Sequence, residues 1–185
     1  MGGREITALF KTWGTEPRER ELEFPCDLYE GNFSDAYFRG ITIRAEPETI
    51  FPWLCQMRVA PYSYDWIDNL GRKSPRYIIP GLDRLAVGQK FMFIFDLVDF
   101  QQNRYLTLRV DKRFRKLFGD TLISYIIVRQ QPNLSRLLVK ILIKYPRGPL
   151  GILVKTLLPP GDLIMMRKQF INFRNLSETV LAGKG

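Results

Sequence analysis

Residues 121–145 read TLISYIIVRQQPNLSRLLVKILIKY, and this stretch decides the fold class. It contains two apolar runs, Thr121–Gln130 and Ser135–Tyr145, separated by a short polar segment. In the second run the odd-numbered positions from Leu137 onward are apolar and basic residues recur on the other side, a spacing that fits either a strand or a basic amphipathic helix. Because Val and Ile dominate and the run ends just before Pro146, we predict two antiparallel strands.

Shorter β-rich runs precede this pair. Phe91–Leu97 and Tyr105–Val110 are bounded by polar turns and extend the antiparallel sheet. Tyr37–Ile43 has the alternation of a strand and is the first one in the chain. We therefore expect a sheet whose first strand is separated from the others by the helices described next.

Two short helices are predicted after the first strand. Pro47 suits a first helical position, and apolar residues recur at helical spacing as far as Met57. The second helix covers Ser63–Leu70, with Ser63 as its N-cap and Gly71 as its C-terminal stop. The segment that follows is rich in Pro and Gly and predicts a connection.

A long amphipathic helix closes the chain. Pro160-Gly161-Asp162 is a helix-start signal, and the apolar stripe that follows predicts a helix as far as about Leu181. The members of that stripe include Leu163, Met166, Phe170 and Phe173. An upstream apolar piece, Leu150–Leu158, is separated from this helix by Pro159-Pro160 and fits either a short helix or the end of a strand.

The first 35 residues differ in composition from the rest of the chain. Residues 1–35 are polar and mostly acidic, but Trp13 and Phe24 are too apolar for a free tail, so we predict an arm packed on one domain of residues 36–182. The formal net charge is +9, and residues 101–185 carry 16 basic against 4 acidic groups. Such a bias raises the local attraction to anionic partners.

The order of these elements resembles the START-like superfamily, also called polyketide cyclase/dehydrase and lipid transport or SRPBCC. Local motifs between Trp13 and Leu176 are similar as well: AYFRGITIRA at 36–45, PETIFPWL at 47–54, YSYDW at 62–66, IP at 79–80 with LAVG at 85–88, PGDLIMMRK at 160–168, and in the arm WGT at 13–15 and FPCD at 24–27. One difference is that YSYDW follows Ala60-Pro61, where family members usually have glycine-rich residues, so we expect a differently shaped ligand entrance.

The resemblance implies an α+β helix-grip fold, in which a curved antiparallel sheet wraps around the long C-terminal helix. An apolar cavity between the sheet and the helix is used in the superfamily for lipids, sterols, polyketides or other hydrophobic ligands. The implied function is binding or carriage of a hydrophobic, lipid-like or polyketide-like small molecule. One alternative is an enzyme that acts on a hydrophobic substrate in the same cavity, like a cyclase or dehydratase. The other, which the basic charge favours, is a protein that docks on an anionic membrane surface or an acidic partner.

The sequence lacks residues that several kinds of catalytic, metal and nucleotide sites require. The chain has no histidine, which excludes Ser-His and Cys-His nucleophile pairs and His-ligated zinc, and so favours binding over catalysis. Asp65 and Asp68 are three residues apart but have no third partner, so we assign no metal. The segment Gly71-Arg72-Lys73-Ser74 lacks the first glycine of a phosphate loop, so we expect no nucleotide and no other cofactor.

The candidate ligand-binding residues come from two helices and two strands. Aromatic residues at the second short helix offer polar groups at an apolar surface, residues of the terminal stripe suit a pocket wall, and two strand residues would orient a ligand headgroup. These are Tyr62, Tyr64, Trp66, Arg109, Tyr125, Met166, Phe170 and Phe173. Core packing for the aromatic and apolar members, and outward-facing positions for Arg109 and Tyr125, are the alternative interpretations.

Partners and location follow from charge and cysteine usage. A hydrophobic small molecule is the expected partner, and the basic residues around Lys112–Lys116 fit either an anionic membrane surface or a solvated hairpin rim. No nucleic-acid recognition motif is present, so we expect no specific nucleic-acid binding. Cys26 and Cys55 are solitary, and neither a signal peptide nor a transmembrane helix is expected, which favours the cytoplasm.

Overall fold

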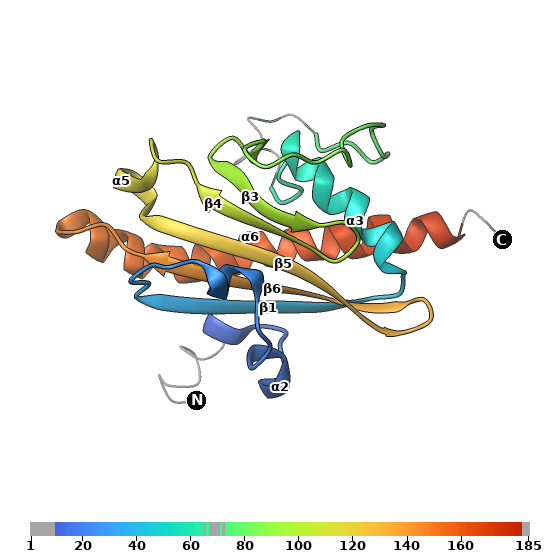
Figure 1. Ribbon diagram of the computed structural model, residues 1–185, viewed down its shortest axis with the longest axis horizontal. Coiled ribbons are helices and arrows are strands. Elements are labelled where there is room, and N and C mark those ends of the chain that lie inside the picture. The colour runs from blue at the N-terminus through green and yellow to red at the C-terminus, as the bar shows by residue number, and fades with distance from the viewer. Residues whose placement is uncertain (1–9, 65, 67–70, 72, 183–185) are drawn as a thin grey trace.

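A six-stranded antiparallel sheet forms the centre of the molecule (Figure 1). The computed structural model describes residues 10–64, 66, 71 and 73–182. The strands are β1 (Asp35–Ile43), β2 (Lys90–Phe91), β3 (Phe95–Gln101), β4 (Tyr105–Val110), β5 (Asp120–Gln131) and β6 (Leu134–Lys144). They are ordered β1-β6-β5-β4-β3-β2, so the first strand of the chain pairs with the last.

β5 and β6 form a long hairpin, as the Val- and Ile-rich runs predict. The turn between them places Asn133 at a φ of 57°, a left-handed conformation that asparagine tolerates well. Leu137, Val139 and Ile141 alternate into the main core, while Lys140 points to the other face. The strand interpretation of this segment is confirmed, and the basic amphipathic helix is wrong.

The predicted strand Phe91–Leu97 is two strands. Met92 and Phe93 have φ values of 45° and 63°, so the backbone turns there and β2 folds back on β3. Apolar alternation does not reveal such a turn when the residues that make it are themselves apolar.

Short helices connect the strands. They are α2 (Pro17–Arg20) and η1 (Pro25–Leu28) before the sheet, α3 (Pro47–Cys55) and η2 (Gln56–Arg58) after β1, and α5 (Arg115–Phe118) between β4 and β5. α3 begins at Pro47, as expected, and contains Pro52 in its interior. The second predicted helix, Ser63–Leu70, falls mostly outside the described residues.

The C-terminal helix is longer than the sequence predicts. α6 (Pro149–Ala182) has 34 residues, which corresponds to about 51 Å, and it continues through Pro159 and Pro160. The two prolines remove hydrogen bonds from the middle of the helix but do not end it, and residues 150–158 form its first part. By length and composition alone, Pro149–Thr179 would also suffice to span a membrane, a property that core helices of soluble proteins share.

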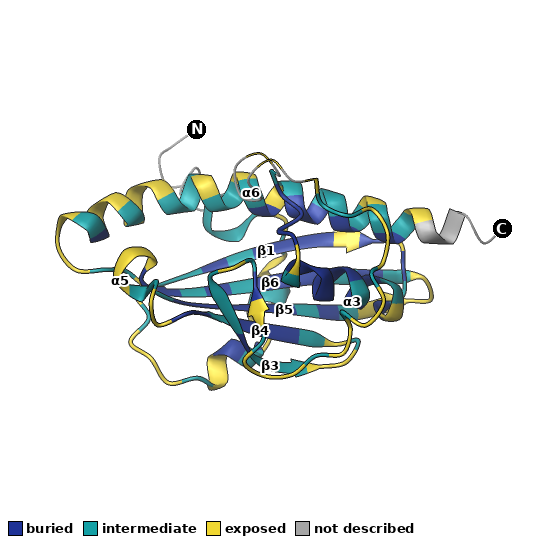
Figure 2. Cartoon of the chain, turned by 90° about the horizontal axis from the view of Figure 1, so that it is seen from above, coloured by how far each residue is buried: buried dark blue, intermediate teal, exposed yellow. Residues whose placement is uncertain are grey.

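The main core lies between the sheet and the two larger helices. α6 runs along one face of the sheet (Figure 2), and α3 packs against both α6 and β5. The buried side chains come from every strand and from both helices; they include Tyr37, Ile43, Ile50, Trp53, Phe91, Leu97, Leu108, Tyr125, Val139, Phe170 and Phe173. This arrangement is an α+β helix-grip fold, in which the sheet curves around the terminal helix.

The opposite face of the sheet is covered by the segment before β1. Phe24 and Cys26 are buried there against Leu122 and Leu138. Acidic side chains of this segment pair with basic ones on β6: Glu19 binds Arg136 at 2.6 Å, and Asp27 binds Lys140 at 2.6 Å. Residues 10–34 therefore neutralise part of the positive charge of the sheet.

The free edge of β1 also contacts this segment. The Gly40 N–H donates to the Trp13 carbonyl at 3.1 Å, and the next residue, Gly14, has a φ of 73°. A Cβ atom at Gly14 would lie 2.1 Å from the Gly40 carbonyl oxygen. Only glycine allows this close approach, which closes one edge of the sheet.

The two cysteines are separate and buried. Cys26 and Cys55 are both free thiols, as their spacing predicts. Burial raises the pKa of the Cys26 thiol to about 11 and that of Cys55 to about 12, so both are protonated at neutral pH.

Candidate functional site

The interface between the sheet and α6 brings together four of the predicted ligand-binding residues. Tyr125 on β5 and Met166, Phe170 and Phe173 on α6 belong to one core cluster, and none is more than 7% exposed. The Phe173 ring lies 5.6 Å from the ring of Tyr62. These four side chains are packed as core residues, and they lead to a pocket at the Tyr62 end of the interface.

Gln169 is a polar residue in the middle of this apolar interface, with 3% of its surface exposed. Its Oε1 accepts a hydrogen bond from the Tyr125 hydroxyl at 3.0 Å, and its Nε2 donates to the Pro61 carbonyl at 2.6 Å. Burial, and then the carboxylate of Asp162, raise the pKa of Tyr125, which keeps its hydroxyl a donor. Gln169 thus ties β5 to the segment that leads into Tyr62.

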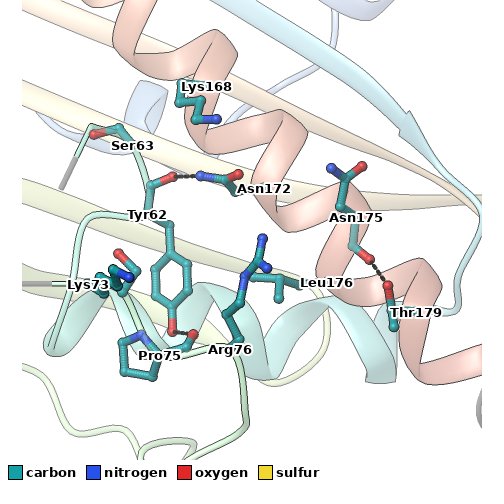
Figure 3. A pocket seen from close by; sticks show the side chains of 11 residues that line it. Tyr62, Ser63, Lys73, Pro75, Arg76, Lys168, Asn172, Asn175, Leu176 and Thr179 are labelled. Carbon is teal, nitrogen blue, oxygen red and sulfur yellow. Dashed lines mark hydrogen bonds between the residues drawn. The ribbon is translucent and has the colours of Figure 1, made fainter.

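Tyr62 adopts a backbone conformation that bulky residues rarely take, with a φ of 59°. Its hydroxyl donates to the Pro75 carbonyl and accepts from Gln56 Nε2, each at 2.8 Å, and Asn172 donates to its carbonyl at 2.8 Å (Figure 3). Gln56 also accepts from the Ile79 N–H at 2.8 Å. Strained backbone persists only where its surroundings hold it, and here three separate segments do so.

A pocket of about 610 Å³ opens beside Tyr62, between the loop that follows it and the second half of α6. Its walls are formed by Tyr62, Ser63, Lys73, Ser74, Pro75 and Arg76 from the loop side and by Lys168, Asn172, Asn175, Leu176 and Thr179 from α6. Figure 3 shows Arg76 extending from the loop toward Leu176, with the Tyr62 ring beside Pro75. The pocket therefore joins a polar, basic wall to a smaller apolar one.

The electrostatic character of this pocket is one-sided. Lys73, Arg76 and Lys168 line it, and none of the described residues in its walls is acidic. Lys168 is partly buried on α6, and Lys73 and Arg76 are exposed on the loop. Three cations around a concave surface attract an anionic group.

Two aromatic candidates lie away from the sheet–helix interior. Trp66 is 75% exposed, so it does not contribute to the wall of an internal cavity. Tyr64 is half-buried and is not one of the described residues that line the pocket. Exposure increases from Tyr62 through Tyr64 to Trp66, so Tyr62 is the buried one of the three aromatic residues.

Arg109 faces away from α6. Its neighbours Leu108 and Leu106 are in the main core, so the alternation of β4 places Arg109 on the opposite face of the sheet. There its Nε and Nη2 donate to the two carboxylate oxygens of Asp120 at 3.0 and 2.6 Å. This pair raises the pKa of Arg109 and lowers that of Asp120, and Arg109 is a structural residue of the outer face.

A buried ion pair joins β1 to α6. Arg39 is fully buried, and its Nη2 donates to Asp162 Oδ2 at 2.6 Å. Burial raises the pKa of Asp162, and the Arg39 charge opposes that rise. Next to it the hydroxyls of Tyr37 and Tyr145 share a hydrogen bond of 2.5 Å. The middle of α6 is therefore held to the sheet by polar contacts.

Sequence reasoning missed the residues that organise the site. Gln56 and Gln169 are buried polar side chains within apolar runs, and Asn172 follows Gln169 by three residues on α6. A polar residue at a core-facing helical position is a signal for a specific hydrogen bond, and Gln169, three residues after Met166, gave that signal. No sequence pattern marks Lys73 and Arg76 as pocket residues, because they lie in a loop that approaches α6 only in the folded structure.

Comparison with known proteins identifies the fold. No protein-family model and no curated protein matches the sequence. Among solved structures, the protein CV1439 from Chromobacterium violaceum aligns with a TM-score of 0.51 at 10% identity, over 77% of this chain and 96% of its own. The hypothetical protein jhp0584 from Helicobacter pylori aligns with a TM-score of 0.50 at 12% identity, over 84% and 95%.

A START superfamily protein from Mycobacterium smegmatis is also similar, with a TM-score of 0.44 at 13% identity, over 80% of this chain and 99% of that protein. The chain has a helix-grip fold. The order of the strands and the position of α6 carry this assignment. Identities of this size establish the fold and leave the ligand open.

Metal binding has no cluster of ligands in the described part of the chain. Among residues 10–64, 66, 71 and 73–182, no three Cys, Asp or Glu side chains converge on a point that would hold a cation. The groups that the pocket offers to a ligand are the cations of its lysines and arginine, the amides of its asparagines and the ring of Tyr62.

Proposed function

We propose that the protein binds a hydrophobic small molecule that carries an anionic group, and that this group lies in the pocket beside Tyr62. The observation that carries the proposal is the charge of the pocket, in which Lys73, Arg76 and Lys168 face no described acidic residue. A carboxylate placed among three cations in a concave site gains attraction that solvent screens only in part.

The apolar part of the ligand has a surface of its own. Tyr62, Pro75 and Leu176 form the apolar side of the pocket, and Tyr62 leads on to Phe173 in the core. The volume of about 610 Å³ is within the range of roughly 300–1,000 Å³ that small-molecule sites occupy. The helix-grip fold supports this part of the proposal, because the START-like superfamily that the sequence resembles holds hydrophobic ligands against its terminal helix, and α6 forms one wall of this pocket.

The proposal assigns different roles to the residues around the site. Lys168, which is partly buried on the rigid helix, holds the anionic group, and Arg76 reaches toward the same space from the loop. Asn172 and Gln56 position Tyr62 through their hydrogen bonds to its carbonyl and its hydroxyl. Hydrogen bonds from the Tyr62 hydroxyl to Pro75 and from the Ile79 N–H to Gln56 hold the loop that carries Arg76.

The test is a titration of the purified protein with a fluorescent fatty acid and with its methyl ester. We expect saturable binding of the acid, and binding of the uncharged ester that is weaker by about tenfold, which corresponds to about 1.4 kcal/mol. The Arg76→Gln, Lys168→Gln double variant should bind the acid about as weakly as the ester. Arg167→Gln, an exposed position next to Lys168 that does not line the pocket, is the matched control and should keep full affinity.

Two outcomes would contradict the proposal. If the acid and the ester bind with equal affinity, the cations do not contribute to binding. The same conclusion follows if the double variant binds the acid as tightly as the unmodified protein does. If neither compound binds saturably, the proposal that the protein binds a hydrophobic ligand is wrong.

A further inference from the structure

The first half of α6 exposes apolar side chains to solvent. Leu153 is 54% exposed, Leu157 59%, Ile164 56% and Ile152 72%. Leu153, Leu157 and Ile164 are four and seven residues apart, so they lie on one stripe of the helix. A surface helix normally turns polar side chains to water, and this part of α6 exposes apolar side chains there as well.

This stripe is distinct from the face that packs on the protein. Val154 and Leu158 are half-buried, Leu158 packs on the main core, and Asp162 is held by Arg39. In Figure 1 the first turns of α6 extend past the ends of the strands, and in Figure 2 they are mostly exposed. The exposed stripe therefore has no partner among the described residues of the chain.

α5 adds to the same surface. Its residues Leu117 and Phe118 are 50% and 39% exposed. The glycine that ends it, Gly119, lies against the Lys144 carbonyl and Pro146, where the chain leaves β6 and enters α6. Both views place α5 near the beginning of α6 (Figures 1 and 2). We call these exposed residues of α5 and of the first half of α6 the apolar end.

Basic residues surround the apolar end. They are Lys112, Arg113, Arg115, Lys116, Lys144, Arg147 and Lys155. Between residues 112 and 161 the sequence contains one acidic residue, Asp120, and that carboxylate pairs with Arg109 at 2.6 Å and with Arg115 at 3.4 Å. Lys112, Lys116, Lys144, Arg147 and Lys155 are all exposed.

We infer that the apolar end docks on an anionic lipid membrane, with the first half of α6 lying in the plane of the interface. Apolar side chains on one face of a helix enter the boundary between headgroups and acyl chains, and adjacent lysines and arginines bind anionic headgroups. The charge decides between occupants, because a second copy of this chain would bring an equally basic surface against the first. This inference rests on other residues than the proposed ligand site, which uses the second half of α6.

The test is flotation of the full chain with vesicles of phosphatidylcholine alone and of phosphatidylcholine mixed with phosphatidylserine, at low and high salt. We expect the protein to float with the anionic vesicles at low salt and to be released by salt. The Leu153→Ser, Leu157→Ser double variant should lose about tenfold or more of its partitioning. The Val87→Ser, Phe93→Ser variant changes two residues that are 65% and 63% exposed outside the apolar end, and it should float as the unmodified protein does.

A charge variant tests the other half of the inference. Lys116→Gln with Arg147→Gln should weaken binding to the anionic vesicles by about tenfold and leave the circular dichroism spectrum unchanged.

Three results would overturn the inference. One is failure to float with anionic vesicles at low salt. Another is equal flotation with phosphatidylcholine alone and at high salt, which would indicate insertion without a role for charge. The third is a dimer in analytical ultracentrifugation that Leu153→Ser, Leu157→Ser dissociates, since the apolar end would then be an interface between copies.

Discussion

Arg39 carries a charge into the interior of the protein. It lies on β1 between Tyr37 and Ile41, and its guanidinium is 5.7 Å from the centre of the Tyr37 ring. Its only acidic partner among the described residues is Asp162, two residues after Pro160 on α6. Because a charge removed from water needs a partner, this contact allows essentially one position of α6 on the sheet.

We predict that removing one member of this pair destabilises the protein more than removing both. Asp162→Asn leaves Arg39 buried without a counter-charge and should lower the free energy of unfolding by about 3 kcal/mol, measured by urea denaturation. Arg39→Met with Asp162→Leu should recover most of that loss. Asp120→Asn, at the more exposed pair with Arg109, should cost about 1 kcal/mol or less. Equal losses for Asp162→Asn and Asp120→Asn would contradict the prediction.

At the scale of residues, the sequence predicts that several of the candidate residues lie together. Tyr62, Phe170 and Phe173 meet as expected, because aromatic residues in a motif and on an amphipathic stripe are driven to the same core. Arg109 could not be placed, since a strand with one polar and one apolar side allows either orientation until its register is known. The three cations of the pocket depend on a loop conformation that no periodicity describes.

At the scale of elements, α6 consists of two parts with different surroundings. The two prolines remove the backbone donors that would bind the carbonyls of Lys155 and Thr156, and the exposed part before them has few buried contacts. The part after them holds Phe170 and Phe173 in the core.

We predict that these two parts open separately in hydrogen exchange. Amides of residues 150–158 should exchange faster than those of 164–179 by about a hundredfold or more, because their opening does not disturb the core. Replacing Pro159 and Pro160 by alanine restores two hydrogen bonds and should slow exchange in the first part only. A single exchange rate along the whole helix would show that α6 opens as one unit.

The elements themselves follow from the sequence where their pattern is strong. The β5–β6 hairpin and α3 lie where the alternation of Val and Ile and the position of Pro47 predict them. The beginning of α6 was misplaced by 12 residues, because Pro160-Gly161-Asp162 has the composition of a helix start and the helix continues through it. Packing between neighbouring elements overrides such a local signal.

At the scale of the whole molecule, the acidic segment before β1 covers apolar residues of the sheet and compensates part of its positive charge. It covers Leu122 and Leu138 with Phe24, and it places Glu19 and Asp27 on two basic residues of the sheet. The uneven charge of the sequence is therefore partly compensated in the fold.

We predict that a chain without residues 1–34 is less stable and associates with itself. Loss of the Phe24 side chain alone, in Phe24→Ala, should lower the free energy of unfolding by about 3 kcal/mol, and the truncation should lower it further by exposing the outer face of the sheet. Thermal unfolding and light scattering measure the two effects. A truncated chain that melts at the original temperature as a monomer would show that the segment does not contribute to stability.

The pairing of β1 with β6 sets the order in which this protein can fold. Asp35 pairs with Ile143 and Ile43 with Ser135, so β1 waits for a partner that lies roughly 100 residues later in the chain. A nascent chain therefore carries an unpaired β1 until most of the protein has been synthesised, and the contact between Trp13 and Gly40 shields its other edge. We therefore expect the β3–β6 meander, whose contacts are local, to form before β1 closes the sheet.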